Sequence, residues 1–173
     1  MEPTDVQAVQ ETLKAQYRAD GTNALVTVRA AAGESSDPFA VSAQIAGSTS
    51  DVQAHPGIGG AGTEASSSDL LLGALAACAQ VTCQMLAAAA NIPIRTVAVR
   101  VEGDLDLRGA LGLSPFARVG LSKLRIFFDI DAPDATRHQI DQLQRDTERY
   151  CVVLQTLQVP PPIEAYWSEP TTV

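Results

Sequence analysis

The stretch SSSDLLLGALAAC, residues 66–78, opens the segment that decides the fold, because the run from Asp69 to Asn91 carries almost no charge. Ser66 followed three residues later by Asp69 predicts a capping box, which satisfies free N–H groups of the first helical turn. The run is long enough for a helix of roughly 34 Å. We therefore predict a long core helix at the centre of the fold.

The polar and the small residues of this helix indicate that it packs against other parts of the protein rather than against lipid. Gln80 and Gln84 lie in mid-run and no basic residues flank it, which argues against a membrane span of the same length. Small residues, among them Gly73 and the alanines at 87–90, allow another helix to approach closely. A chain of 173 residues can hardly cover such a helix, so we expect a homodimer.

Composition limits the classes of function. The chain is long enough for one domain with a sizeable core, and its formal charge of -8 makes nucleic acid and anionic membranes poor partners. The first residues, Met1 to Asp5, show no secretory signal, so we expect a cytoplasmic protein. Three cysteines are too few for a disulfide framework. In a reducing compartment, such thiols are catalytic, metal-binding or simply buried.

The elements around the long helix favour an α+β fold with mostly antiparallel sheets. We predict a helix over Thr4–Tyr17, a hairpin of strands over Leu25–Ala30 and Phe39–Ala46, and a loop over Gly47–Ser68. After the long helix we predict strands over Thr96–Glu102 and Arg118–Ile130, the second with a bulge or bend near Ser122–Lys123. A second helix then runs from Pro133–Asp134 through Cys151 until Pro160–Pro162 ends it, and a short last strand covers Ile163–Trp167. No repeated βαβ unit is present.

The cysteines are the residues best suited to chemistry. The chain contains no P-loop, no nucleophile elbow, no zinc-protease motif and no Cys-x-x-Cys, and it has two histidines, so we expect neither a cofactor nor a metal site. Cys78 and Cys83 lie five residues apart, about 140° round the helix, and cannot form a disulfide. Cys83 fits a small buried hydrophobic residue. Any disulfide would include Cys151.

Two motifs resemble one known family. The segment DLLLGALAAC at 69–78, followed by NIPI at 91–94, the strand from Val97 to Glu102 and YCVV at 150–153, resembles the OsmC/Ohr family of osmotically induced proteins and organic hydroperoxide reductases. The likeness covers about Ala24 to Trp167. It implies an OsmC-like α+β fold, with curved antiparallel sheets around the long helices of an intertwined homodimer. Residues 1–23 would then be a helical extension, and residues 24–173 the OsmC-like domain.

The resemblance also implies a thiol mechanism. In active members of that family, the cysteine at the position of Cys78 attacks a peroxide as a thiolate and becomes a sulfenic acid. The cysteine at the position of Cys151 then forms a disulfide with it. A dithiol of the lipoyl type restores both thiols. We expect organic hydroperoxides as substrates, because the residues around Cys78 are apolar.

The chain departs from the family pattern at the groups that activate the thiol. Active members bring an arginine from the first hairpin loop, held by the glutamate of a Pro-Glu pair, but residues 31–38 contain no arginine and the pair is replaced by Ser67–Ser68. Arg29, and after it Arg18, are the candidate replacements for the arginine, and Asp69 is the nearest carboxylate, although it suits capping better. Family members also commonly have Cys-Pro where this chain has Cys151-Val152.

Two hypotheses follow from these residues. The first is a cytoplasmic thiol-dependent peroxidase of the OsmC type, acting in oxidative stress defence and using the Cys78/Cys151 pair. The alternative is a non-catalytic dimer of the same fold that binds a ligand or senses redox state. Retention of both cysteines favours the peroxidase, whereas the missing loop arginine favours the alternative.

Overall fold

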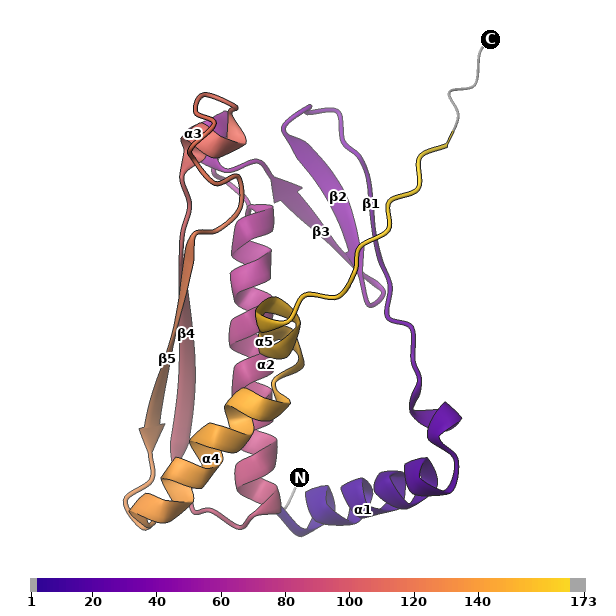
Figure 1. Ribbon diagram of the computed structural model, residues 1–173, viewed down its shortest axis with the longest axis vertical. Coiled ribbons are helices and arrows are strands. Elements are labelled where there is room, and N and C mark those ends of the chain that lie inside the picture. Colours follow the sequence, from indigo (N-terminus) through magenta and orange to yellow (C-terminus); the bar gives the residue numbers. More distant parts are fainter. Residues whose placement is uncertain (1–2, 169–173) are drawn as a thin grey trace.

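The computed structural model describes residues 3–168 and shows two antiparallel sheets arranged around one long helix (Figure 1). In chain order the helices and strands are α1 (Pro3–Ala19), η1 (Gly21–Ala24), β1 (Ala30–Glu34), β2 (Ala40–Ile45), β3 (Ser48–Gln53), η2 (Pro56–Ile58), α2 (Ser67–Ala89), β4 (Thr96–Asp104), α3 (Leu107–Ala110), β5 (Lys123–Asp131), α4 (Arg137–Tyr150) and α5 (Val152–Gln158). The α+β class and the antiparallel pairing expected from the sequence are confirmed.

The long helix α2 begins and ends as its sequence predicts. The Ser66 hydroxyl accepts a hydrogen bond from the Asp69 N–H, and the Asp69 carboxylate accepts one from the Ser66 N–H at 2.8 Å, so the capping box is complete. At the other end, Asn91 has a φ of 51°, the left-handed conformation that commonly terminates helices. The Gln7 side chain of α1 donates to the Ala89 carbonyl at 2.7 Å, which satisfies an acceptor that the helix leaves free.

The two-stranded sheet of β4 and β5 packs against α2 and fixes its position (Figure 1). Gln80 holds the two elements together, because its side-chain NH₂ donates to the Val97 carbonyl at 3.2 Å and its oxygen accepts from the Val99 N–H at 3.3 Å. These two hydrogen bonds to the backbone of β4 explain why a glutamine occurs within an apolar helix.

Two clusters of buried side chains make the core, and both run along α2. The first surrounds Cys83, Ala87, Ile92 and Leu143, where α4 crosses α2. The second surrounds Leu75, Ala79 and Cys151, where α5 and the two-stranded sheet meet α2. A fully buried leucine contributes about 1.5 to 3 kcal/mol through removal from water, so Leu75 and Leu143 are principal anchors.

The three-stranded sheet of β1, β2 and β3 corrects two sequence predictions. Residues 25–29 form no regular structure, and the first strand begins at Ala30 instead. The predicted loop over Gly47–Ser68 contains β3, which pairs with β2 after a tight turn at Ala46 and Gly47. Among the described residues, no helix packs extensively across this sheet, and Val52 is its one buried residue.

The C-terminal half differs from the sequence predictions in three ways. β5 begins at Lys123 rather than Arg118 and pairs with β4 without a bulge, while the chain bends at Ser122, so of the predicted bulge or bend near Ser122–Lys123 the bend is present. The predicted second helix is divided into α4 and α5, with Cys151 at the junction. Residues Ile163–Trp167 form no strand among the described residues, and Trp167 is 93% exposed.

One side of α2 lies open along much of the helix. Leu71, Val81 and Met85 are 40%, 53% and 44% exposed. By length and composition alone the helix could cross a membrane, and only 22% of its most apolar window is buried. Its contacts with β4, α1, α4 and α5 nevertheless place it at the centre of the fold, as a core helix with one uncovered side.

Candidate functional site

The fold brings Cys78 and Cys151 together. Cys78 lies in the middle of α2 and packs against the cluster that contains Leu75, Ala79 and Cys151. Cys151 is completely buried, whereas Cys78 is partly exposed, and both are free thiols. Two cysteines that are distant in the sequence therefore share one apolar site, and the more exposed of them, Cys78, is accessible to a dissolved substrate.

The chain geometry at Cys151 explains its position. Cys151 is both the residue after α4 and the residue before α5, with φ -71° and ψ 105°, so the chain bends there. Its N–H donates to the Thr147 carbonyl and its carbonyl accepts from the Gln155 N–H. Both helices therefore hold the backbone of Cys151, while no side chain caps the start of α5.

Hydrogen bonds to the sulfur favour the thiolate form of Cys78. Burial raises the pKa of the Cys78 thiol, but hydrogen bonds from the Val153 N–H, the Cys151 thiol, the Thr82 hydroxyl and the Val152 N–H together outweigh it, so the pKa lies below that of an ordinary cysteine. No arginine or lysine of the described residues contributes to this effect. The thiolate fraction, which determines the nucleophilicity available at neutral pH, is thus increased by neutral donors.

The environment of Cys151 has the opposite effect. Burial raises the pKa of Cys151, and its neighbour Cys78 raises it further, although N–H groups of Leu154 and Val153 partly oppose this. Cys151 therefore holds its proton more firmly than Cys78 does. This division of roles suits one attacking thiolate and one thiol that reacts later.

Cys83 belongs to a different part of the core. It is 1% exposed and packs with Ala87, Ile92 and Leu143. Burial raises the pKa of the Cys83 thiol, and the neighbouring Thr147 hydroxyl lowers it only in part. That hydroxyl is itself buried without a hydrogen bond of ordinary geometry. The sequence prediction that Cys83 is a buried hydrophobic residue agrees with this placement.

The two other candidate residues lie outside the thiol cluster of this chain. Asp69 caps α2, and hydrogen bonds from the Ser66 hydroxyl and N–H lower the pKa of its carboxyl group. Arg29 is exposed on the irregular segment before β1 and donates to the Thr27 carbonyl at 3.5 Å. Neither residue acts on the Cys78 sulfur. A role for either in the reaction stays a prediction.

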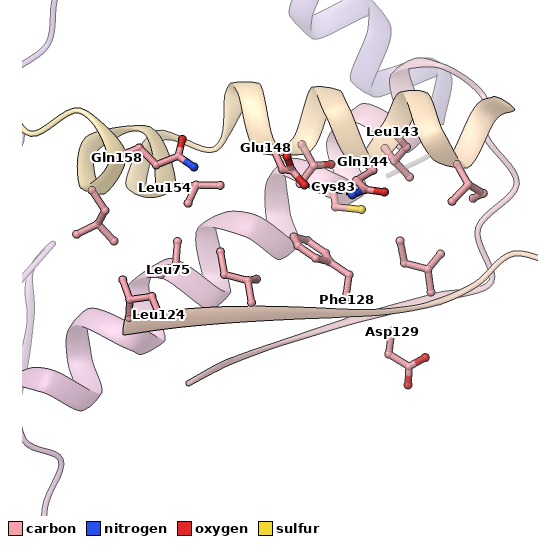
Figure 2. Close-up of a pocket in the computed structure, with 15 residues that line it drawn as sticks. Leu75, Cys83, Leu124, Phe128, Asp129, Leu143, Gln144, Glu148, Leu154 and Gln158 are labelled. Carbon is pink, nitrogen blue, oxygen red and sulfur yellow. Dashed lines mark hydrogen bonds between the residues drawn. The ribbon is translucent and has the colours of Figure 1, made fainter. Parts of the chain in front are cut away.

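A cavity of about 920 Å³ lies beside the thiol pair, between β5 and the helices α4 and α5 (Figure 2). Most of its lining is aliphatic, and Figure 2 shows Gln144 and Glu148 of α4 on the side opposite Phe128, while Asp129 points away. Cys83 lines the cavity, whereas Cys78 and Cys151 do not. Leu75 and Leu154 belong to both the cavity and the thiol cluster, so the two are adjacent.

Sequence reasoning missed the donors at the Cys78 sulfur. Thr82 is one helical turn after Cys78, and this spacing was the available signal. The N–H groups of Val152 and Val153 carry no sequence signal, since they reach Cys78 through the packing of α5 against α2.

Comparisons with known proteins agree with this arrangement. The family model of OsmC-like proteins matches residues 60–165, which include both cysteines of the pair. No curated protein matches the chain significantly.

Solved structures show where the same fold occurs. The OsmC-like protein of Mycoplasma pneumoniae has a TM-score of 0.65 at 20% identity, over 78% of this chain and 89% of that chain. An organic hydroperoxide resistance protein of Legionella pneumophila has a TM-score of 0.56 at 17% identity, over 78% and 91%. Another organic hydroperoxide resistance protein, from Elizabethkingia anophelis, has a TM-score of 0.58 at 16% identity, over 79% of this chain and 91% of that chain. At such identities the likeness shows the fold alone.

Proposed function

This chain belongs to the family of OsmC-like proteins, and we propose that it is a thiol-dependent peroxidase that reduces organic hydroperoxides through Cys78 and Cys151. The observation that carries the proposal is the contact between a partly exposed thiol with a lowered pKa and a buried thiol with a raised one. Solved structures of the same fold include proteins named for organic hydroperoxide resistance, which agrees with this chemistry.

The proposed reaction has three steps. The Cys78 thiolate attacks one peroxide oxygen, the O–O bond breaks, and the alkoxide leaves as an alcohol after taking up a proton, which makes Cys78 a sulfenic acid. The Cys151 thiol attacks the sulfenic sulfur, so a disulfide forms and water leaves. An external dithiol, of the lipoyl type, then reduces the disulfide and is itself oxidised to a disulfide.

The surroundings of the thiols support an organic rather than a small polar peroxide. Side chains of Leu75 and Leu154 link the thiol cluster to the aliphatic cavity, which offers room for the apolar group of a hydroperoxide. Removing such a group from water contributes about 25 cal/mol for each Å² buried. A substrate with an apolar group would therefore bind better than hydrogen peroxide.

We also propose that the working unit is a cytoplasmic homodimer. The open side of α2, with Val81 and Met85, and the uncovered three-stranded sheet leave more apolar surface than a stable monomer usually exposes. A second copy that covers α2 and this sheet would bury that surface. Cys78, next to the open side of α2, would then lie near the interface.

A non-catalytic dimer that binds a ligand or senses redox state is the second candidate. Two observations favour it: no guanidinium reaches Cys78 in the described residues, and the cavity between β5, α4 and α5 is not lined by the thiol pair. An assay of tert-butyl hydroperoxide consumption with dihydrolipoamide separates the candidates. The peroxidase proposal predicts turnover by the natural protein and none by Cys78→Ser, whereas the alternative predicts no turnover by either.

A further inference from the structure

The cavity beside the thiol pair separates β5 from the helices α4 and α5 (Figure 2). β5 packs on β4, and both helices pack on α2, but among residues 3–168 neither helix packs extensively on β5. The strand and the helices therefore face each other across a space of about 920 Å³. A space of this volume is large enough for a small-molecule ligand.

The walls of the cavity are mostly apolar. Alternate residues of β5 form one wall, because successive side chains of a strand point to opposite faces, and Phe128 accordingly points toward α4 while Asp129 points away. Leu143 of α4 and Leu154 and Leu157 of α5 belong to the opposite wall. No lysine, arginine or histidine of the described residues lines the cavity. A ligand that fits these walls has an apolar body.

Thr147 of α4 adds one hydrogen-bonding group to this apolar lining. The residue is 2% exposed, and its hydroxyl oxygen is buried without a hydrogen-bond partner. Thr12 and Thr156 donate their hydroxyls to the backbone carbonyl four residues earlier, which Thr147 does not do. The nearby Cys83 thiol is only a weak hydrogen-bonding group. Because buried hydroxyls are nearly always paired, Thr147 indicates a ligand with a polar atom at this point.

The edge of the cavity carries a negative charge. Glu148 follows Thr147 on α4 and is exposed, and the side-chain NH₂ of Gln144 donates to its carboxylate at 3.3 Å. Both side chains lie opposite Phe128 (Figure 2). A ligand carboxylate would meet the like charge of Glu148 and would lose its water to apolar walls that offer no cation. An uncharged ligand is therefore favoured over a fatty acid.

We propose that this cavity binds an uncharged aliphatic alcohol, with its hydroxyl group paired to Thr147 and its hydrocarbon chain between β5 and the two helices. An alcohol can accept a hydrogen bond from Thr147 or donate one to it, whereas a plain hydrocarbon would leave Thr147 unpaired. The inference goes beyond the proposed function, because Cys78 and Cys151 do not line the cavity and binding involves no redox step. The alcohol would compete with the apolar group of a hydroperoxide for the same space.

Two pairs of substitutions separate the role of the hydroxyl from the role of the space. Thr147→Val removes the hydroxyl at nearly constant volume, and Thr147→Ser retains it as the rescue variant. Leu157→Trp enlarges a half-buried side chain that lines the cavity. Its matched control, Val159→Trp, places the same group on a residue that is 74% exposed and outside the lining.

The test is isothermal titration calorimetry with 1-decanol and the fully reduced protein as purified. The alcohol should bind the natural protein, Thr147→Ser and Val159→Trp alike. Thr147→Val should bind it about three- to tenfold more weakly, which is the usual effect of losing one hydrogen bond. Leu157→Trp should show no measurable binding. Circular dichroism verifies that every variant is folded.

A second titration needs no variant. Sodium decanoate has a chain of the same length and is ionised at about pH 8. It should bind the natural protein more weakly than 1-decanol does, because its charge meets Glu148 without a positive partner. Equal or tighter binding of decanoate would contradict the proposed class of ligand.

Three further results would overturn the proposal. Absence of 1-decanol binding to the natural protein would show that the cavity is closed in solution or filled by a second copy. Unchanged binding by folded Leu157→Trp would place the alcohol elsewhere, and unchanged binding by folded Thr147→Val would remove the hydrogen bond. Because the titrations contain no peroxide, a protein that reduces hydroperoxides but binds no alcohol would contradict this inference alone and leave the proposed function standing.

Discussion

Cys78 and Cys151 lie in one buried cluster, where α2 meets the junction of α4 and α5. Their pairing makes the two cysteines unequal. Burial raises the pKa of both thiols, but the neighbouring Cys151 lowers the pKa of Cys78, whereas Cys78 raises that of Cys151 further. Cys78 is thereby suited to the first, nucleophilic step, and Cys151 to the later step.

This inequality predicts the order of alkylation. Cys78 should react first with iodoacetamide and at a lower pH than a free cysteine, whereas Cys151 and Cys83, both at most 1% exposed, should stay unmodified in the folded protein. Peptide-resolved mass spectrometry across pH 6 to 9 measures this. Earlier modification of Cys151 than of Cys78 would reverse the assigned roles.

The contact between the two cysteines predicts which disulfide forms. Mild treatment with an organic hydroperoxide should link Cys78 to Cys151, as detected by mass spectrometry of unreduced peptides. Cys151→Ser should leave a sulfenic acid on Cys78 that dimedone traps, and Cys83→Ser should behave like the natural protein. A dominant product that contains Cys83 would exclude the proposed pair.

The open side of α2 predicts the oligomeric state. Light scattering at micromolar concentration should give the mass of a dimer. The interfaces of permanent homodimers bury on the order of 2,000 Å² or more, which keeps the two subunits together at this concentration. Val81→Glu places a charge on the open side of α2 and should yield monomers. Leu113→Glu, on a loop residue that is 71% exposed, is the matched control and should remain dimeric. A natural protein that is monomeric would refute the assembly.

The burial of Cys83 predicts part of the pH dependence of stability. Burial raises the pKa of Cys83 in the folded state, only partly offset by Thr147, so the unfolded state loses this proton first. The contribution of the protonated Cys83 thiol to the free energy of unfolding is complete below about pH 8.5. It is lost as the pH rises through the pKa that Cys83 has in the folded state.

The measurement for this prediction is urea unfolding between pH 7.5 and 10. The free energy of unfolding should fall less steeply with pH in Cys83→Ala than in the natural protein, even though the variant is less stable at neutral pH. Equal slopes for the two proteins would show that Cys83 keeps an ordinary pKa when folded.

Local signals made much of the fold predictable. The capping box at Ser66 and Asp69 and the break at Asn91–Pro93 specify α2 within a few residues, because cap chemistry acts over one turn. β3 was missed because Ser48–Gln53 is polar and mostly exposed, so no apolar alternation marks it. Its strand pairing follows instead from the tight turn at Ala46 and Gly47.

The candidate site was predictable only in part. The resemblance to a known family placed Cys78 and Cys151 together, and the structure brings them into contact. The split between α4 and α5 at Cys151 and the donors at the Cys78 sulfur depend on how three helices pack, which no local pattern records. For the same reason, the sequence could not show that Arg29 lies away from Cys78 within one chain.

A single-turnover measurement tests the proposed peroxidase activity most directly. One equivalent of cumene hydroperoxide is added to the fully reduced protein, and the alcohol released is compared with the thiols lost. The account predicts stoichiometric cumyl alcohol together with loss of the Cys78 and Cys151 thiols, and no alcohol from Cys78→Ser. Recovery of the hydroperoxide unchanged, with both thiols still free, would contradict it.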